Sequence, residues 1–203
     1  MKESIRYQEA IRRNIFAINY AFWEWKILVS LDNYRAIKNK EVAFYGASFF
    51  DVSYVAIYSD MIRNSINVLE KKKRNDVVSF WYLLRSKAII KTLKSYSEEK
   101  TISLESLTKK LMVIRDKVFY HYDKEAILDI NNIWRSNSIS AKESGEGLEY
   151  LFCVLRELYQ KVFNQEYSLH PEEYREEEFF RLLDLAGENN LLEVHPKINE
   201  SMN

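Results

Sequence analysis

Only four glycines and two prolines interrupt the 203 residues of this chain. A sandwich or barrel of many short strands needs frequent turns, and these two residues make most of them. Long helices with few breaks are therefore the architecture that the sequence favours. With 47% hydrophobic and 30% charged residues, the chain has the composition of a globular protein, and its length suits one domain with an appendage.

The first strong helical pattern lies near the N-terminus. Apolar residues recur there at alternating steps of four and three, which predicts a helix over residues 4–31 with one buried face. These residues are Ile11, Ile15, Ile18, Phe22, Trp25 and Val29. Asn19, Glu24 and Lys26 interrupt the apolar run, so we expect a buried amphipathic helix and not a membrane span.

The single cysteine and the polar N-terminus bear on the cellular compartment. Cys153 excludes an internal disulfide framework and suits a reducing compartment. No apolar secretory block is visible at the N-terminus. We therefore expect a cytoplasmic protein, with no membrane partner.

Three more helices are expected before residue 124, each from a capping residue followed by an apolar stripe. The expected caps are Ser48, after a connecting segment over residues 32–46, then Asp76 and Ser103. The stripes are Val52, Val55, Ile62, Ile66 and Leu69, then Val77, Phe80, Trp81, Leu84 and Ala88, then Leu107, Leu111, Ile114 and Val118. The third helix has a basic outer face, because Lys87, Lys91 and Lys94 follow at four-then-three spacing.

A Ser-, Asn- and Gly-rich loop is expected over residues 136–147, before a fifth helix. That helix turns Leu148, Leu151, Phe152, Leu155, Leu158 and Val162 inward, with Cys153 packed beside them. Pro171 opens a short last helix that ends at Gly187. We expect an all-α bundle of four to five main helices over residues 1–165 and an acidic C-terminal appendage over residues 166–203.

Charge is unevenly distributed although the net charge is zero. Residues 71–124 contain 14 Lys or Arg against 6 Asp or Glu, and residues 142–203 contain 6 against 14. The basic centre is compatible with an anionic partner such as RNA. The acidic run from Glu172 to Glu178 either lies across that centre and competes with RNA, or is a solvated end.

The stretch RDKVFYHYD, residues 115–123, carries the residues best suited to chemistry. Arg115 has the side chain that best clamps a phosphate, and His121 moves a proton near neutral pH. On a regular helix the two are separated by about 120° and about 9 Å, so a twofold dimer would be needed to bring two pairs into one cleft. His121 also continues the apolar stripe, which leaves open an inert core His beside an Arg in a surface ion pair.

Arg115, Asp116 and His121 resemble the motif of the HEPN superfamily, in which an Arg and a polar residue precede a His after a gap of four to six. The wider context LMVIRDKVFYHYDKE is similar to the AbiU-type (abortive infection) branch. The resemblance covers about residues 5–165 and is strongest over residues 107–124. It implies a HEPN-like helical bundle that dimerises so that both motifs face one groove, with a toxin–antitoxin or phage-defence role.

The resemblance also implies a reaction, cleavage of RNA without a metal or cofactor, in which a 2′-hydroxyl attacks the adjacent phosphate. Arg115 would hold the phosphate, His121 would exchange protons with the attacking or leaving oxygen, and Asp116 would orient Arg115. The RNA-binding lysines would be Lys117, Lys87, Lys91 and Lys94.

The implied protein partner, a possible metal site and a second class of function each bear on this interpretation. The implied protein partner is a nucleotidyltransferase-type antitoxin, yet the position where some HEPN toxins carry a modified Tyr is Asp123 here, beside Tyr122. His121, Asp123 and Glu125 are unsuited to bind a metal together, because alternate residues on a helix point apart. A non-catalytic helical interaction module, in which the Arg/His motif is structural, is the alternative to the enzyme.

Overall fold

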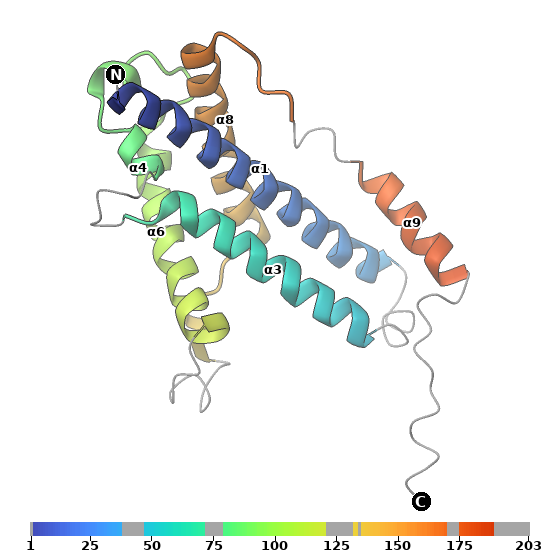
Figure 1. The fold of residues 1–203 in the computed structure, drawn as a ribbon. Helices are drawn as coiled ribbons and strands as arrows, with labels where there is room; N and C mark the ends of the chain where they lie inside the picture. The colour runs from blue at the N-terminus through green and yellow to red at the C-terminus, as the bar shows by residue number, and fades with distance from the viewer. Residues whose placement is uncertain are drawn as a thin grey trace, which may run out of the picture.

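The computed structural model describes residues 2–37, 47–71, 79–120, 132–133, 135–169 and 175–188. Every regular element in those residues is helical, as expected for an all-α bundle. Four long helices form the body (Figure 1), and they are α1 (Lys2–Ile37), α3 (Ala47–Leu69), α6 (Glu98–Ile114) and α8 (Ala141–Phe163). Two single-turn helices, α4 (Phe80–Leu83) and α5 (Lys87–Ile90), precede α6, η1 (Arg115–Tyr120) continues it, and α9 (Glu176–Glu188) follows α8.

Helix α1 is the scaffold on which the other helices pack, since it contacts α3, α8, α4 and α9. Figure 1 shows α1 and α3 lying side by side in front of α6 and α8. The predicted stripe of α1 is buried over its first part, with Ile11, Ile15 and Ile18 at 0% exposure, whereas Trp25 and Val29 are partly exposed. The helix runs to Ile37 because Tyr34 is also buried, so the connecting segment predicted from residue 32 is wrong over its first six residues.

The end of α3 that approaches α6 is well buried, whereas its middle is not. Ile62, Ile66 and Leu69 are at most 1% exposed, as their spacing predicts. Val55 is 53% exposed, so its assignment to the buried stripe is wrong. None of the described helices combines the length and the apolar character needed to cross a membrane.

Two glycines of α8 lie where that helix packs against α1 and α6. A Cβ added at Gly145 would lie 2.4 Å from a ring atom of Trp25, and one at Gly147 would lie 2.7 Å from a methyl of Leu107 on α6. The indole N–H of Trp25 donates to the backbone oxygen of Ala141 at 2.9 Å. Both glycines therefore belong to the helix interior, and the loop predicted over residues 136–147 is wrong from residue 141 onward.

Serine side chains begin α6 and α8, at positions that the sequence pattern misjudged. Ser97 and Ser140 each accept a hydrogen bond from the backbone N–H three residues later, at 3.3 and 3.0 Å. Ser103, predicted as the cap of α6, lies inside the helix and donates to a backbone oxygen one turn earlier. Ser48 is likewise inside α3, which already includes residue 47. A Ser–acid pattern does not say which of several serines is the cap.

The third predicted helix is wrong, because residues 80–97 form two single turns joined by non-helical segments. Ala88, predicted to face inward, is exposed, and Leu83 is fully buried. Asp76, the predicted cap, lies outside the described residues. The basic face expected from one continuous helix is therefore not formed.

Contacts from other helices hold this broken segment. The indole N–H of Trp81 donates to the backbone oxygen of Leu69 at the end of α3. The carboxylate of Glu157 on α8 accepts from the backbone N–H groups of Lys94 and Ser95, both at 2.9 Å. Burial alone would raise the pKa of Glu157, but these hydrogen bonds outweigh burial and lower the pKa. The turn before α6 is thus fixed by a charge-assisted contact that no local pattern reveals.

The acidic helix α9 lies against the C-terminal end of α1 (Figure 1). Tyr34 donates to Asp184 at 2.9 Å and packs against the ring of Phe180, and Asn33 donates to Glu176 at 2.9 Å. The helix continues through Glu188, past the predicted end at residue 187. Pro171, the predicted start, lies outside the described residues, as do residues 172 and 173 of the acidic run. The contacts that Glu176 makes are with α1, not with the basic centre.

Candidate site at the end of helix α6

The stripe of α6 leads into the motif as predicted, but the helix changes its geometry at Arg115. Leu107, Leu111 and Ile114 are buried, and residues 115–120 then form a π-helical turn. π-Helical hydrogen bonds join residues five apart. Such turns are rare in proteins as a whole, and those that occur are often found at functional sites. The separation of about 120° that a regular helix gives Arg115 and His121 therefore does not apply here. His121 itself lies outside the described residues.

Two carboxylates surround the guanidinium of Arg115. Its Nε donates to Oδ1 of Asp116 at 2.6 Å, and its Nη1 lies 3.7 Å from Oε2 of Glu70. The Arg115 and Glu70 side chains are 22% and 18% exposed, and the Asp116 side chain is 43% exposed. The short bond places Asp116 where it can orient the guanidinium, and both pairs lie partly out of water, where charges interact more strongly.

Glu70 was not identified from the sequence, and it is the residue that directly follows α3. Its neighbour Lys71 pairs with Glu105 of α6 at 2.5 Å, and the Lys71 ammonium lies 4.4 Å from the ring centroid of Trp81. The hydrogen bond from Lys71 lowers the pKa of Glu105. Two ion pairs of opposite polarity therefore join the end of α3 to α6 and η1. In the sequence Glu70 is only an acid before a basic run, which gives no signal of this contact.

The lysines predicted to bind RNA do not lie on one continuous helix. Lys117 lies in the π-helical turn and is partly buried. Lys87 opens α5, Lys91 follows its last residue, and Lys94 lies beyond both in the turn before α6. All three are exposed, and the single helix that was expected to carry them is wrong. Their role in binding RNA stays a prediction.

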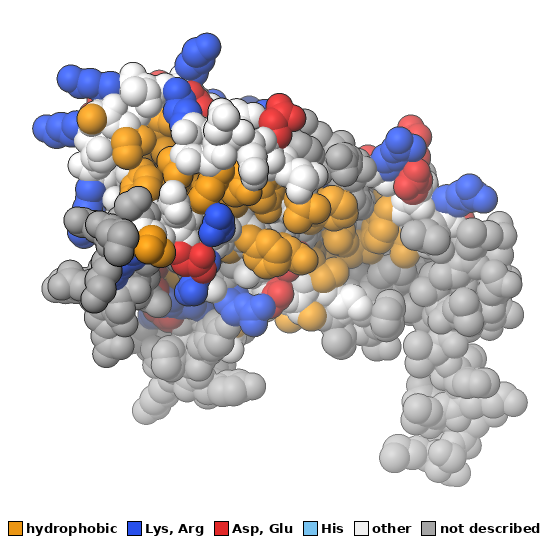
Figure 2. Space-filling model, turned by 45° about the horizontal axis from the view of Figure 1, so that its top comes forward, with side chains coloured by type: hydrophobic (Ala, Val, Ile, Leu, Met, Phe, Trp, Pro, Cys, Tyr) orange, Lys and Arg blue, Asp and Glu red, His pale blue; other side chains and the backbone are white. Residues whose placement is uncertain are grey.

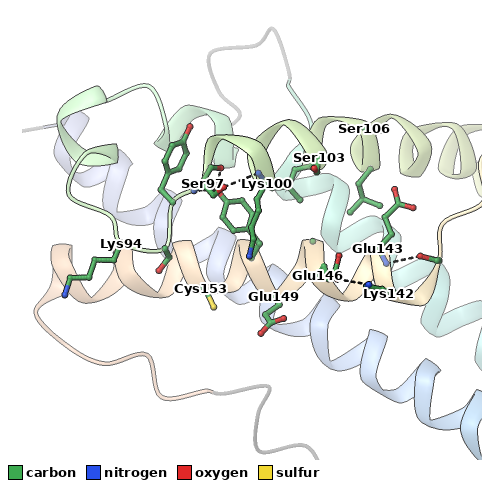
Figure 3. Close-up of a pocket in the computed structure, with 17 residues that line it drawn as sticks. Lys94, Ser97, Lys100, Ser103, Ser106, Lys142, Glu143, Glu146, Glu149 and Cys153 are labelled. Carbon is green, nitrogen blue, oxygen red and sulfur yellow. Dashed lines mark hydrogen bonds and ion pairs between the residues drawn. The ribbon is translucent and has the colours of Figure 1, made fainter.

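A groove lies between α6 and α8, and Arg115 does not line it. It has a volume of about 1150 Å³, and Figure 3 shows that basic and acidic side chains both line it. The charged residues are Lys94, Lys100, Lys142, Glu143, Glu146 and Glu149. The Tyr150 hydroxyl joins the two helices: it donates to the backbone oxygen of Ser97 at 2.9 Å and accepts from the backbone N–H of Ser97 at 3.0 Å. Because its charges balance, this groove does not favour an anion over a cation.

A smaller groove of about 600 Å³ lies beside η1 and is mainly apolar and aromatic. Phe119 of η1 meets the edge of the Tyr58 ring at 6.2 Å, and Tyr54 stacks with Tyr58 at 6.4 Å. Burial and the neighbouring Tyr54 raise the pKa of Tyr58 to about 12, so its hydroxyl stays neutral near pH 7. These rings attach the π-helical turn to α3, and they supply packing more than chemistry.

An apolar band is visible on the face of the molecule shown in Figure 2. The large hydrophobic residues that remain exposed on α1 are Ile5, Phe16 and Tyr20, at 61%, 52% and 48%. The rings of Phe16 and Tyr20 lie 4.7 Å apart. Phe16 and Tyr20 therefore form an exposed aromatic pair on α1.

The described residues offer no evident metal ligands. No three His, Cys, Asp or Glu side chains within the described ranges gather closely enough to hold an ion. His121, Asp123 and Glu125, weighed as ligands in the sequence, lie outside those ranges. Comparison of the chain with protein-family models, with curated proteins and with solved structures gives no significant match.

Proposed function

We propose that this chain is a metal-independent endoribonuclease of the HEPN type, which acts as a homodimer in a toxin–antitoxin or phage-defence role. The observation that carries the proposal is the arrangement at Arg115. Arg115 begins the π-helical turn over residues 115–120, its Nε donates to Asp116 at 2.6 Å, and His121 is the next residue in the sequence after that turn. The arginine, oriented by a carboxylate, is suited to bind the phosphate, and the histidine six residues later is suited to transfer protons. Phosphodiester transfer requires both groups.

The reaction proposed is an internal transesterification. The 2′-hydroxyl oxygen attacks the adjacent phosphorus while its proton passes to a base, and the bond from phosphorus to the 5′ oxygen breaks. The leaving oxygen takes up a proton, so that a cyclic phosphate and a 5′-hydroxyl remain. Arg115 stabilises the charge that develops on the phosphate, and His121 exchanges the protons. In a homodimer, two histidines would serve as base and acid.

The test is RNA cleavage by purified protein in the presence of a chelator. We expect cleavage to proceed, with product ends that are a cyclic phosphate and a 5′-hydroxyl. His121→Ala and Arg115→Ala should each reduce the rate by at least about 100-fold, the usual contribution of a general acid or base or of a charge-stabilising group. Absence of cleavage by the wild-type protein, or cleavage that the chelator abolishes, would refute the proposal.

The dimer is tested separately by molar mass. Mass measurement at micromolar concentration should give twice 24.3 kDa. A monomer at that concentration would contradict a cleft shared by two copies.

The second candidate is a non-catalytic helical interaction module, and the contact between Arg115 and Glu70 favours it. That ion pair joins η1 to α3 at 3.7 Å and would give Arg115 a purely structural role. Under this alternative, Arg115→Ala lowers the melting temperature and the wild-type protein does not cleave RNA. Under the enzyme proposal, cleavage is lost and the melting temperature is nearly unchanged.

A further inference from the structure

The ion pair between Glu70 and Arg115 bears directly on how a phosphate would reach the guanidinium. Among the described residues, Arg115 faces two carboxylates, those of Asp116 and Glu70, and these three side chains together carry one net negative charge. An RNA phosphate brings a further negative charge. A two-pronged contact with phosphate therefore requires at least one carboxylate to move away from Arg115.

We propose that Glu70 is a gating residue, which occupies Arg115 in the resting protein and is displaced by an RNA phosphate when substrate binds. The inference rests on the proposed function, because it assumes that Arg115 takes the phosphate. It assigns to Glu70 the regulation of that same site. Glu70 is thus a positioning residue that acts through Arg115 and does not touch the reacting atoms.

The two carboxylates differ in a way that identifies Glu70 as the one displaced. Asp116 is joined to Nε by a bond of 2.6 Å, and it follows Arg115 directly in the chain, so it moves with the guanidinium. The distance of 3.7 Å between Nη1 and Glu70 is an ion pair but is too long for a hydrogen bond. A phosphate oxygen at about 2.8 Å would make a charge-assisted hydrogen bond in its place, which is the stronger interaction.

Glu70 directly follows α3, whereas Arg115 begins η1, so their contact depends on how the end of α3 sits against η1. The neighbouring pair of Lys71 and Glu105, at 2.5 Å, joins the same end of α3 to α6 without touching Arg115. Glu105→Gln therefore breaks a comparable interhelical ion pair and leaves the gate in place. It is the matched control for Glu70→Gln, which removes the charge of the gate and preserves its shape.

The experiment measures binding and not cleavage, so that it is independent of the test of the proposed function. The probe is a single-stranded 2′-O-methyl oligoribonucleotide, which lacks the attacking hydroxyl, and the readout is fluorescence anisotropy across a salt series. We expect Glu70→Gln to lower Kd by about 3- to 10-fold, the effect of removing one competing carboxylate from a charge-assisted contact. The slope of log K against log salt should steepen by up to about 0.7, as for one more phosphate contact. Glu105→Gln should stay within about twofold of the wild-type Kd, since exposed pairs contribute little.

A double-mutant cycle shows whether Glu70 acts through Arg115. In an Arg115→Ala background, Glu70→Gln should no longer change Kd. If Glu70→Gln does not fold, Glu70→Asp withdraws the carboxylate by one CH₂ group and should also tighten binding. The proposal is overturned if removal of the gate leaves Kd equal or higher, if no variant binds the oligonucleotide, or if the tightening persists without Arg115. If the wild-type protein does not cleave RNA, the ribonuclease proposal is refuted, but the binding comparison of the Glu70 variants is still valid.

Discussion

The contact of α8 with α1 and the outer edge of the contact of α3 with α6 and η1 differ in the side chains that make them. The first is apolar and close enough that Gly145 admits the ring of Trp25, and Leu151 and Leu155 further along α8 are 0% exposed. The second is held at its end by the ion pairs of Glu70 with Arg115 and of Lys71 with Glu105.

The difference separates what stabilises this fold from what can take part in binding. Burial of a leucine stabilises a protein by about 2 kcal/mol, and a tightly packed contact cannot rearrange without creating a cavity. A partly exposed ion pair contributes about 0–1 kcal/mol and can exchange its partner for another ion. We therefore expect substitutions at the α1–α8 contact to change stability and substitutions at the α3–α6 end to change function.

The largest effect on stability is predicted for Leu151→Ala in α8. The side chain is fully buried, so its truncation leaves a cavity in the core. We predict a loss of about 3 kcal/mol in the free energy of unfolding, measured by denaturant titration. Glu149→Ala, two residues away and exposed, serves as the control and should change it by less than about 0.5 kcal/mol. Equal effects of the two substitutions would show that α8 is not packed as described.

A smaller loss is predicted for Gly145→Ala. Alanine favours a helix over glycine by about 1 kcal/mol, but the new Cβ would lie 2.4 Å from the ring of Trp25. Because overpacking costs about 1–3 kcal/mol, we predict a net loss of about 1 kcal/mol. Gly147→Ala is the matched comparison, since its Cβ meets only the methyl ends of the flexible Leu107 and Leu104 side chains, at 2.7 and 3.4 Å. Stabilisation by both substitutions would show that the approach at residue 145 is not tight.

Glu24 gives a pH-dependent test of the interface between α1 and α3. Burial raises the pKa of Glu24 to about 7, the hydrogen bond from Asn64 opposes that rise, and Asp60 adds to it. The folded protein therefore binds a proton more tightly than the unfolded chain, and stability is lost as pH rises from about 4.5 to about 7.

Glu24→Gln removes this titration. We predict that the variant is more stable than the wild-type protein at pH 8 by about 1 kcal/mol, well below the value that the full pKa shift would give, because the half-buried group is partly screened. The advantage should vanish at pH 4, where Glu24 is protonated in both states. Thermal melts at the two pH values measure it, and an advantage that is the same at both would contradict a raised pKa.

The sequence predicted the apolar half of the molecule well and the polar half poorly. The stripes of α1 and α8 were recognised because a buried helical face repeats its apolar residues at a fixed period. The break between Leu83 and Lys94 was missed, since it depends on a carboxylate of α8 that caps backbone N–H groups about 60 residues away. Gly145 was assigned to a loop, because a local pattern cannot distinguish a glycine that turns from one that admits another helix.

The candidate site divides in the same way. The motif residues Arg115 and Asp116 were identified from the sequence, and the structure places them in contact. Glu70 was missed, since nothing near it in the sequence signals a partner 45 residues later. The π-helical turn was also missed, because projection on a helical wheel assumes a constant angle for each residue.

The most direct test of the separation between stability and function is to measure both on Arg115→Ala. The free energy of unfolding should fall by less than about 1 kcal/mol, as for a partly exposed ion pair, while RNA cleavage in chelator falls by at least about 100-fold. A loss of stability as large as that of Leu151→Ala, with no cleavage by the wild-type protein, would instead make Arg115 a structural residue and contradict the ribonuclease proposal.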